Sequence, residues 1–217
     1  AKKLYSLSKK KKSIIVINHQ RRFEKNYVIA RNIIKKKIIG NIKFINACYT
    51  RKIFNIGTHL IDIIRMLVSS ELSFTSSFYV EKTLKKDPSL SGLIFFKNKI
   101  ICAVQAIGYK FKYIFDIEIF GDKGKIRITN NGNKLDVFKF KKSKNFTNYS
   151  ELEKIKLNKK LFSVKKVNDP IKDLINNSLN ACTKRFKPNP SIYDGYQNLL
   201  IAKTMEKSAK QKKIIKV

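Results

Sequence analysis

Residues Tyr113–Asn130 read Y-I-F-D-I-E-I-F-G-D-K-G-K-I-R-I-T-N and indicate the fold class most clearly. Two short runs rich in β-branched and aromatic residues, Tyr113–Phe120 and Lys125–Asn130, flank the turn sequence Gly121–Gly124. This pattern predicts two antiparallel strands joined by a tight turn. Because similar short runs recur before and after this stretch, we expect a large, mostly antiparallel sheet.

Further strands and helices follow from the same patterns of hydrophobic spacing. The other expected strands are Lys43–Thr50, Phe74–Glu81, Leu90–Asn98, Lys99–Ile107 and Lys134–Phe140, with Asn145–Asn158 as a polar loop or ragged strand and Ile214–Val217 as an edge strand. The expected helices are Glu24–Ile39, Ile56–Val68, Pro170–Cys182 and Tyr193–Gln211. Together they predict an α+β fold, with the helices on one face of an open sheet.

The other face of this sheet is expected to be partly apolar. Its candidate residues are Phe78, Phe95, Ile101 and Phe115. A large apolar face usually buries against another molecule, so we expect a homo-oligomer formed through the open sheet.

The amino end carries an apolar run that fits this sheet poorly. Ser13–Asn18 reads S-I-I-V-I-N and follows a lysine-rich segment that can form the end of a helix. A continuous β-branched run is typical of a strand buried on both faces of a parallel sheet. One such strand cannot form a sheet alone, so its partners are expected outside this chain.

The composition indicates a soluble, cytoplasmic protein that binds nucleic acid only through bulk charge. The formal charge of +33 comes from 48 basic residues, of which only seven are arginine, and the lysines are spread over the whole chain. Specific base and phosphate recognition relies on the planar arginine side chain. No apolar run approaches the roughly 18 residues that span a membrane, and no signal peptide begins the chain. Three scattered cysteines favour neither a disulfide framework nor a metal site.

One of only two histidines lies at the start of an expected helix. On that helix His59 and Asp62 share a face, Arg65 follows three residues later, and Asn55 precedes His59 by four. An imidazole can exchange the hydroxyl proton when a hydride moves to or from a carbinol, and an amide can hold the hydroxyl. The alternative is structural: Asn55 or Thr58 caps the helix, Asp62 pairs with Arg65, and His59 has no chemical role.

The second histidine, His19, follows the apolar run in the sequence I-N-H-Q-R-R-F. Sites in α/β proteins form at the carboxyl ends of parallel strands, so four residues could reach a ligand there: Asn18, Gln20, Arg21 and Arg22. The alternative is that the arginines hold a domain junction and that His19 is incidental.

Five segments in order resemble the Gfo/Idh/MocA oxidoreductases. They are N-H-Q-R-R-F (18–23), Ile-Gly followed by N-I-K-F-I (39–45), G-T-H-L-I-D-I-I-R-M-L (57–67), D-I-E-I-F-G-D-K-G-K-I-R-I (116–128) and D-G-Y-Q-N-L-L-I-A-K-T-M-E-K-S-A (194–209). The resemblance implies the α/β substrate domain of a two-domain enzyme whose Rossmann domain binds NAD or NADP. Residues 1–23 then resemble the last helix and strand of that Rossmann domain, and 24–217 the substrate-binding and oligomerisation domain.

The resemblance also implies roles for individual residues. His59 matches the family's active-site histidine, Asp62 a structural position, Arg22 an arginine near the domain junction, and Tyr196 a place close to substrate. Asn55 stands where many relatives have an aspartate, which suggests a substrate-orienting amide. The implied substrate is a secondary alcohol of a sugar, polyol or nucleotide sugar.

The family's cofactor motifs do not occur in this sequence. It has no G-x-G-x-x-G loop and no Glu-Lys-Pro, although the family uses both. We therefore expect no NAD(P) binding by this chain alone, with Asn18 and Arg21 as the only candidates for a cofactor contact. The alternative hypothesis is a non-catalytic, sheet-based module for binding or oligomerisation.

Overall fold

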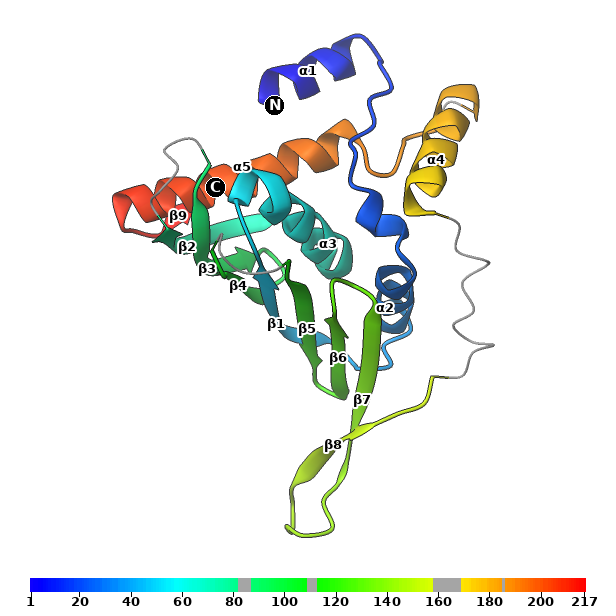
Figure 1. Cartoon of the computed structure of the whole chain (residues 1–217), viewed down its shortest axis with the longest axis vertical. Coiled ribbons are helices and arrows are strands. Elements are labelled where there is room, and N and C mark those ends of the chain that lie inside the picture. Colours follow the sequence, from blue (N-terminus) through cyan, green and yellow to red (C-terminus); the bar gives the residue numbers. More distant parts are fainter. Residues whose placement is uncertain (82–86, 109–112, 158–168, 185) are drawn as a thin grey trace.

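A nine-stranded open sheet forms the centre of the molecule in the computed structural model, which describes residues 1–81, 87–108, 113–157, 169–184 and 186–217 (Figure 1). The strand order is β8-β7-β6-β5-β1-β4-β3-β2-β9. Only β1 and β4 run parallel, and the other neighbours pair antiparallel. The predicted α+β architecture is confirmed.

The strands match the expected runs closely. Their bounds are β1 Ile42–Tyr49, β2 Leu72–Glu81, β3 Ser89–Phe96, β4 Ile101–Ala106, β5 Phe115–Gly121, β6 Gly124–Thr129, β7 Lys134–Lys142, β8 Ser150–Lys154 and β9 Ile215–Lys216. The polar segment predicted as a loop or ragged strand contains β8, and its last residue, Asn158, lies outside the described residues. The predicted edge strand at the carboxyl end is confirmed as β9, which pairs with β2.

The β5–β6 hairpin brings two backbones very close together at its glycines. A Cβ on Gly121 would lie 2.1 Å from the Ile39 carbonyl oxygen, and one on Gly124 would lie 2.1 Å from the Phe138 carbonyl oxygen. Both positions therefore require glycine.

The outer face of the sheet is partly apolar, as predicted, but one of its four predicted residues is wrong. Phe78, Phe95 and Ile101 lie on that face, with Phe78 61% exposed. Phe115 is fully buried, because it begins the alternation of β5 that also buries Ile117 and Ile119. Two paired aromatic contacts lie on the outer face, Phe74 on Phe95 and Phe44 beside Phe120.

The helices pack mainly on the inner face of the sheet, where Figure 1 shows α2, α3 and α5 side by side. Their bounds are α1 Lys2–Lys10, η1 Gln20–Phe23, α2 Lys25–Lys35, η2 Ile53–Gly57, α3 Thr58–Val68, α4 Pro170–Lys184 and α5 Ile192–Gln211. Asp169 accepts a hydrogen bond from the amide of Ile171 at the start of α4, as its position before Pro170 predicts. Figure 1 also shows the β7–β8 hairpin extending beyond the rest of the sheet.

The segment Ser13–Asn18 differs from its prediction as a fully buried strand. It is extended but joins no strand of the sheet, and Val16 forms a single antiparallel bridge with Ser191. Its backbone bonds go to the segment before α5, from Ile17 N–H to the Pro190 carbonyl and from Ile192 N–H to the Ile15 carbonyl. No described strand lies beside it to complete a ladder, so its apolar side chains stay partly exposed.

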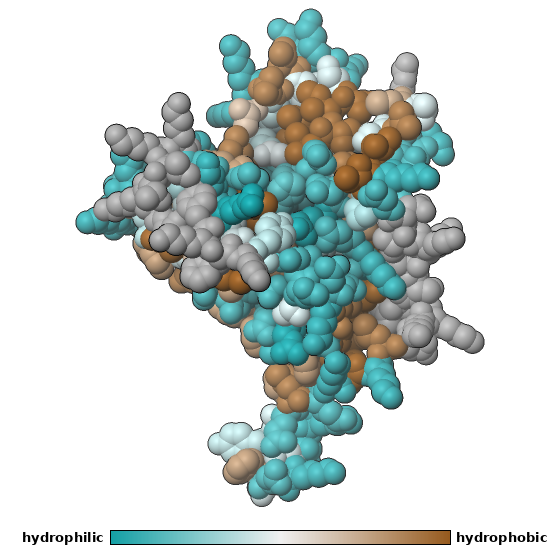
Figure 2. All heavy atoms as spheres, in the orientation of Figure 1, coloured by the Kyte–Doolittle hydropathy of each residue, from teal (hydrophilic) through white to brown (hydrophobic). Residues whose placement is uncertain are grey.

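Figure 2 shows apolar atoms gathered near the top of the molecule, where this segment and the start of α5 lie in Figure 1. A cavity of about 410 Å³ opens there between α1 and the chain before α5, and its apolar lining includes Ile14, Ile15 and Ile192. No described helix is long and apolar enough to cross a bilayer.

Candidate functional site

The candidate site forms where the start of α3 meets η1 and the first turns of α5. The π-helical turn η2 leads directly into α3, whose inner side is apolar and almost fully buried. This burial fixes the helix against the sheet and places His59, in its first turn, at the edge of the core. His59 is therefore half-buried rather than enclosed.

The two histidines of the chain meet at this point. His19 Nδ1 lies 3.4 Å from His59 Nδ1, and the rings are perpendicular with centroids 4.9 Å apart. His19 is buried, and its Nε2 lies 3.1 Å from the side-chain amide of Asn198 on α5. His19, for which the sequence left an incidental role as one alternative, is thus the direct neighbour of the candidate catalytic residue.

Burial makes both imidazoles harder to protonate. Loss of solvent, reinforced by His19 and Arg21, lowers the pKa of His59 to about 4. Loss of solvent also lowers the pKa of His19, although Asp62 opposes the shift. Both rings are therefore neutral at pH 7.

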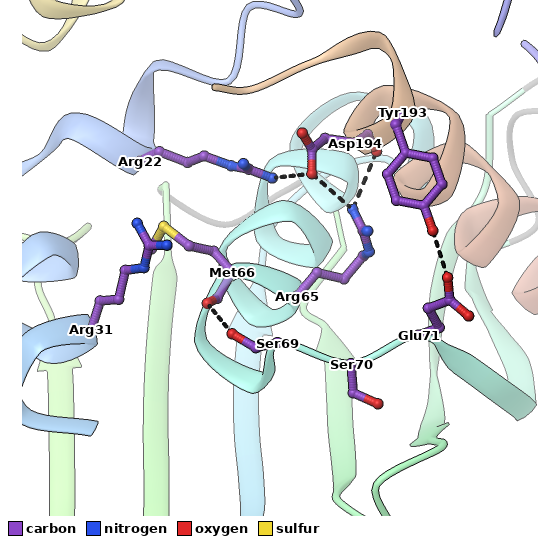
Figure 3. A pocket seen from close by; sticks show the side chains of 9 residues that line it. All are labelled: Arg22, Arg31, Arg65, Met66, Ser69, Ser70, Glu71, Tyr193 and Asp194. Carbon is purple, nitrogen blue, oxygen red and sulfur yellow. Dashed lines mark hydrogen bonds and ion pairs between the residues drawn. The ribbon is translucent and has the colours of Figure 1, made fainter. Parts of the chain in front are cut away.

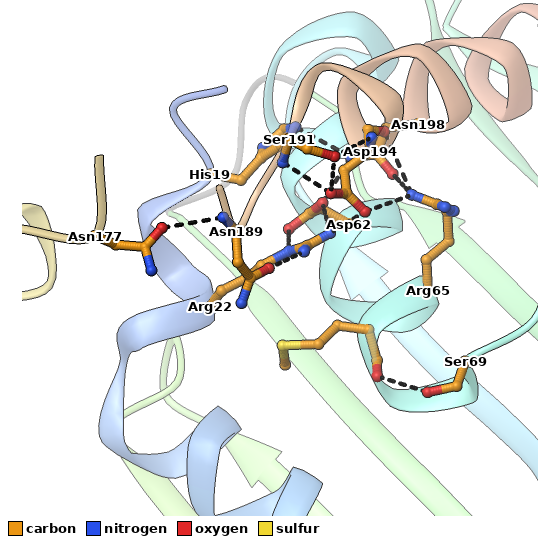
Figure 4. A network of polar contacts seen from close by, with 11 residues as sticks. His19, Arg22, Asp62, Arg65, Ser69, Asn177, Asn189, Ser191, Asp194 and Asn198 are labelled. Carbon is orange, nitrogen blue, oxygen red and sulfur yellow. Dashed lines mark hydrogen bonds and ion pairs between the residues drawn. The ribbon is translucent and has the colours of Figure 1, made fainter. Parts of the chain in front are cut away.

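A buried ion-pair network holds the base of the site (Figure 4). Arg22 donates to both oxygens of Asp62 at 2.6 Å, and it also contacts Asp194 at 3.1 Å and Asn189. Asp62 is only 1% exposed and accepts a further bond from Asn198 at 2.7 Å. Each charge in this network has a partner, as buried charges require.

Asp194 links this network to the first turn of α5. Arg22 and Arg65 both face its carboxylate, and Ser191 donates to it from the backbone and the hydroxyl. Burial alone would raise the pKa of Asp194, but Arg22 and the Ser191 bonds hold it below its usual range. The bond from the Ser191 N–H, together with one from the Asp194 N–H to the Ser191 hydroxyl, forms the capping box that starts α5, so the helix cap and the site share residues.

A polar cavity of about 340 Å³ lies beside the network (Figure 3). Its lining residues are Arg22, Arg31, Arg65, Met66, Ser69, Ser70, Glu71, Tyr193 and Asp194. Tyr193 donates to Glu71, which is also paired with Lys97. In Figure 3, Arg22 and Arg65 approach Asp194 from different sides, which fixes the start of α5 against α3.

The structure brings together some of the residues predicted from sequence and separates others. His59, Asp62, Arg65 and Arg22 belong to one cluster, but Asp62 pairs with Arg22 rather than with Arg65 or His59. Asn55 is exposed on η2, and no hydrogen bond among the described residues joins its side chain to His59.

Three further candidates lie outside the histidine contact. Tyr196 stacks on Tyr5 of α1, with ring centroids 5.4 Å apart. Asn18 is exposed, and Arg21 binds Glu24, the Tyr113 hydroxyl and the Asn131 carbonyl.

The sequence interpretation missed Asn198, Asn189 and Asp194. Asn198 is 1% exposed on the face of α5 that also buries Ile201, Ala202 and Met205. A polar residue at an apolar helix position would have indicated a buried hydrogen-bond network.

The model of one family matches residues 53–217, three quarters of the chain, and its description is "Oxidoreductase family, C-terminal alpha/beta domain". The chain belongs to the Gfo/Idh/MocA oxidoreductase family. The matched residues include η2, α3 with His59, most of the sheet, and α5. The candidate site therefore lies largely within the domain that the family model describes.

Solved structures share the fold at low sequence identity. Levoglucosan dehydrogenase in complex with NADH superposes with a TM-score of 0.80 at 18% identity, covering all of this chain and 69% of that one. The same enzyme with NADH and L-sorbose gives 0.75 at 17%, covering 94% and 66%. An oxidoreductase from Sinorhizobium meliloti gives 0.77 at 16%, covering 99% and 68%. A search of curated protein sequences found no match. The present chain spans about two thirds of the length of the proteins in these structures.

Proposed function

We propose that this chain is the substrate-side portion of an NAD(P)-dependent oxidoreductase that acts on a secondary alcohol of a sugar, polyol or nucleotide sugar. The proposal rests mainly on the position of His59. This residue lies half-buried at the start of α3, and its Nδ1 contacts His19. Its Nε2 has no hydrogen-bond partner among the described residues and is accessible at the surface, so it can meet a ligand.

The chemistry needed is dehydrogenation of a carbinol. A bound nicotinamide would supply the hydride acceptor for the carbinol carbon, and loss of the hydroxyl proton would leave a carbonyl. His59 contacts the reacting oxygen and takes part in proton transfer or carbonyl polarisation, and the exposed amide of Asn55 orients a neighbouring hydroxyl. The Arg22–Asp62 ion pair joins η1 to α3, so the His59 imidazole is held in place before a substrate binds. We assign Tyr196 a place at the outer edge of the substrate site.

The residues of this chain do not suit a dinucleotide by themselves. The sequence has no glycine-rich loop between a strand and a helix, which normally cradles the pyrophosphate. Asn18 and Arg21 are left as edge contacts at most, since Arg21 already binds Glu24 and Tyr113. We propose that the cofactor is held by a Rossmann domain to which residues 1–23 belong. The partly exposed apolar segment Ser13–Asn18, beside its apolar cavity, supports this division.

We also propose that the protein is a cytoplasmic homo-oligomer whose subunits meet through the outer face of the sheet. The apolar residues on that face support the proposal, including Phe44, Phe74, Phe78, Leu93, Phe95, Ile101 and Phe120.

Sugar binding to the chain tests the proposal without requiring turnover. Calorimetric titration with levoglucosan and L-sorbose should detect binding of at least one, and Asn55→Leu should weaken it several-fold because a hydroxyl loses its partner. Asn145→Leu is the matched control, since Asn145 is also exposed but lies in the distant β7–β8 hairpin. Equal affinity in both variants would remove Asn55 from the site. Micromolar binding of NADH to the chain alone, seen by fluorescence, would contradict the proposed division between the two domains.

A further inference from the structure

A single chain of hydrogen bonds joins the guanidinium of Arg65 to the imidazole of His59. Arg65 Nη1 lies 2.9 Å from Asn198 Oδ1. Asn198 Nδ2 lies 2.7 Å from Asp62 Oδ1 and 3.1 Å from His19 Nε2. His19 Nδ1 then lies 3.4 Å from His59 Nδ1. Every residue between the two ends is buried or nearly so.

The direction of these bonds is fixed at the arginine end. A guanidinium only donates, so the oxygen of the Asn198 amide must face Arg65. The amide nitrogen then faces Asp62 and His19, and it also only donates. His19 Nε2 is therefore an acceptor and carries no proton. Asp62 reinforces this orientation, because a carboxylate could not face the amide oxygen without repulsion.

The same logic carries through His19 to the candidate catalytic residue. A neutral imidazole has one protonated nitrogen, so a bare Nε2 on His19 leaves the proton on Nδ1. That nitrogen donates to His59 Nδ1, which leaves the proton of His59 on its outward nitrogen, Nε2. We propose that Asn198 and His19 are positioning residues that hold neutral His59 as its Nε2–H tautomer and so present a hydrogen-bond donor to the substrate oxygen.

The charge balance around the two rings favours this neutral arrangement. Two guanidinium groups, Arg22 and Arg65, face two carboxylates, Asp62 and Asp194, and in the described part of the chain no hydrogen bond or ion pair joins a carboxylate to either imidazole. The burial that lowers the pKa of both histidines acts in the same direction.

The arrangement limits what His59 can do in the proposed reaction. The Nε2–H group can polarise a carbonyl oxygen or hold a hydroxyl as its donor. His59 cannot pass a proton inward, because the hydrogen-bond series leads from His19 to the Asn198 amide, which does not ionise. His19 therefore has no group from which to recover a proton. The hydroxyl proton must therefore be exchanged with a group other than His59. This conclusion deepens the proposed function, on which its chemical meaning rests.

The two-histidine composition makes the tautomers directly measurable. Long-range proton–nitrogen correlation on the chain labelled with ¹⁵N-histidine distinguishes protonated from bare ring nitrogens. At pH 7 we expect Nδ1 to be protonated in His19 and Nε2 in His59. A protonated Nε2 on His19, in either the neutral or the charged ring, would overturn the proposal. The measurement needs no activity, so its failure is independent of the proposed function, and sugar binding could fail while these tautomers stand.

A matched pair of substitutions tests the positioning role. Asn198→Leu removes the donor to His19 Nε2, so the His19 spectrum should change from one tautomer to a mixture of both. Asn177→Leu is the control, because Asn177 lies on α4, accepts from the backbone N–H of Asn189, and has no hydrogen bond to either histidine among the described residues. An unchanged His19 spectrum in Asn198→Leu would show that Asn198 does not set the tautomer. If that variant does not fold, the wild-type spectrum still decides the tautomers.

Discussion

At the scale of single residues, the site depends on burial more than on charge. His59 and His19 are neutral because the protein removes their solvent, and the ion pairs beside them are balanced among themselves. The sequence predicted the helix that carries His59, together with Asp62 and Arg65, because all three lie within seven residues. It could not predict that Asp62 pairs with Arg22, 40 positions away, or that Asn198 completes the network. Such pairings depend on tertiary packing rather than on local spacing.

The lowered pKa of His59 makes stability depend on pH in a defined window. Between the ordinary value of 6.5 and about 4, the unfolded chain binds a proton at this residue that the folded chain does not. The free energy of unfolding should therefore fall as pH drops from 6.5 to 4, with a share on the order of 2 kcal/mol from His59 after allowance for its partial exposure. His59→Gln should lose less stability over this range in urea titrations. Equal losses in both proteins would contradict the shift.

Breaking the Arg22–Asp62 pair should be costly. Arg22→Leu leaves a carboxylate that is 1% exposed without its main partner, which typically destabilises a protein by about 3–5 kcal/mol. Lys97→Leu removes the exposed pair with Glu71 and should cost at most about 1 kcal/mol. Urea unfolding of both variants gives the comparison. A similar small effect of the two substitutions would argue that the buried network does not hold the site.

At the level of helices and strands, the spacing of apolar residues predicted most of the fold. It failed for a segment that has no neighbouring strand among the described residues. The helices and strands appear close to their expected positions because each has its own apolar face. Ser13–Asn18 has a strand-like sequence, but without a neighbouring strand among the described residues it forms one bridge to Ser191. On α5, Asn198 occupies an apolar helix position, which indicates a buried polar network but does not identify its partners.

The start of α5 should be sensitive to its cap. Ser191 and Asp194 exchange hydrogen bonds as a capping box, so Ser191→Ala should destabilise the chain by about 1 kcal/mol. Ser178→Ala is the control, since the Ser178 hydroxyl bonds the Leu174 carbonyl within α4 and alanine is a better helix former. Thermal unfolding should separate the two variants. Should Ser191→Ala prove neutral, the cap would not be what fixes Asp194.

At the scale of the whole molecule, the two faces of the sheet have different roles. The inner face carries α2, α3 and α5 and so positions His59, while the outer face presents phenylalanines. The sequence predicted this division, but it misplaced Phe115 because the first residue of β5 could belong to either face until the register was known.

The outer face should control the oligomeric state. Phe78→Lys places a charge on the outer face of the sheet, where Phe78 is 61% exposed, and should shift the protein toward the monomer in sedimentation experiments. Ile175→Lys on α4 is the control, because Ile175 is about as exposed but lies away from the sheet face. Assembly that is unaffected by Phe78→Lys would assign any oligomer to another surface.

In the proposed site, His59 presents its outer nitrogen, Nε2, to a sugar-like substrate, while His19, itself held by Asn198, donates to its inner nitrogen, Nδ1. The most direct measurement is a titration of the ¹⁵N-histidine-labelled chain with levoglucosan and L-sorbose. We expect a bound sugar to shift the Nε2 resonance of His59 and to leave that of His19 Nε2 in place. Saturating sugar that leaves His59 unshifted, or that shifts His19 Nε2 instead, would contradict this expectation.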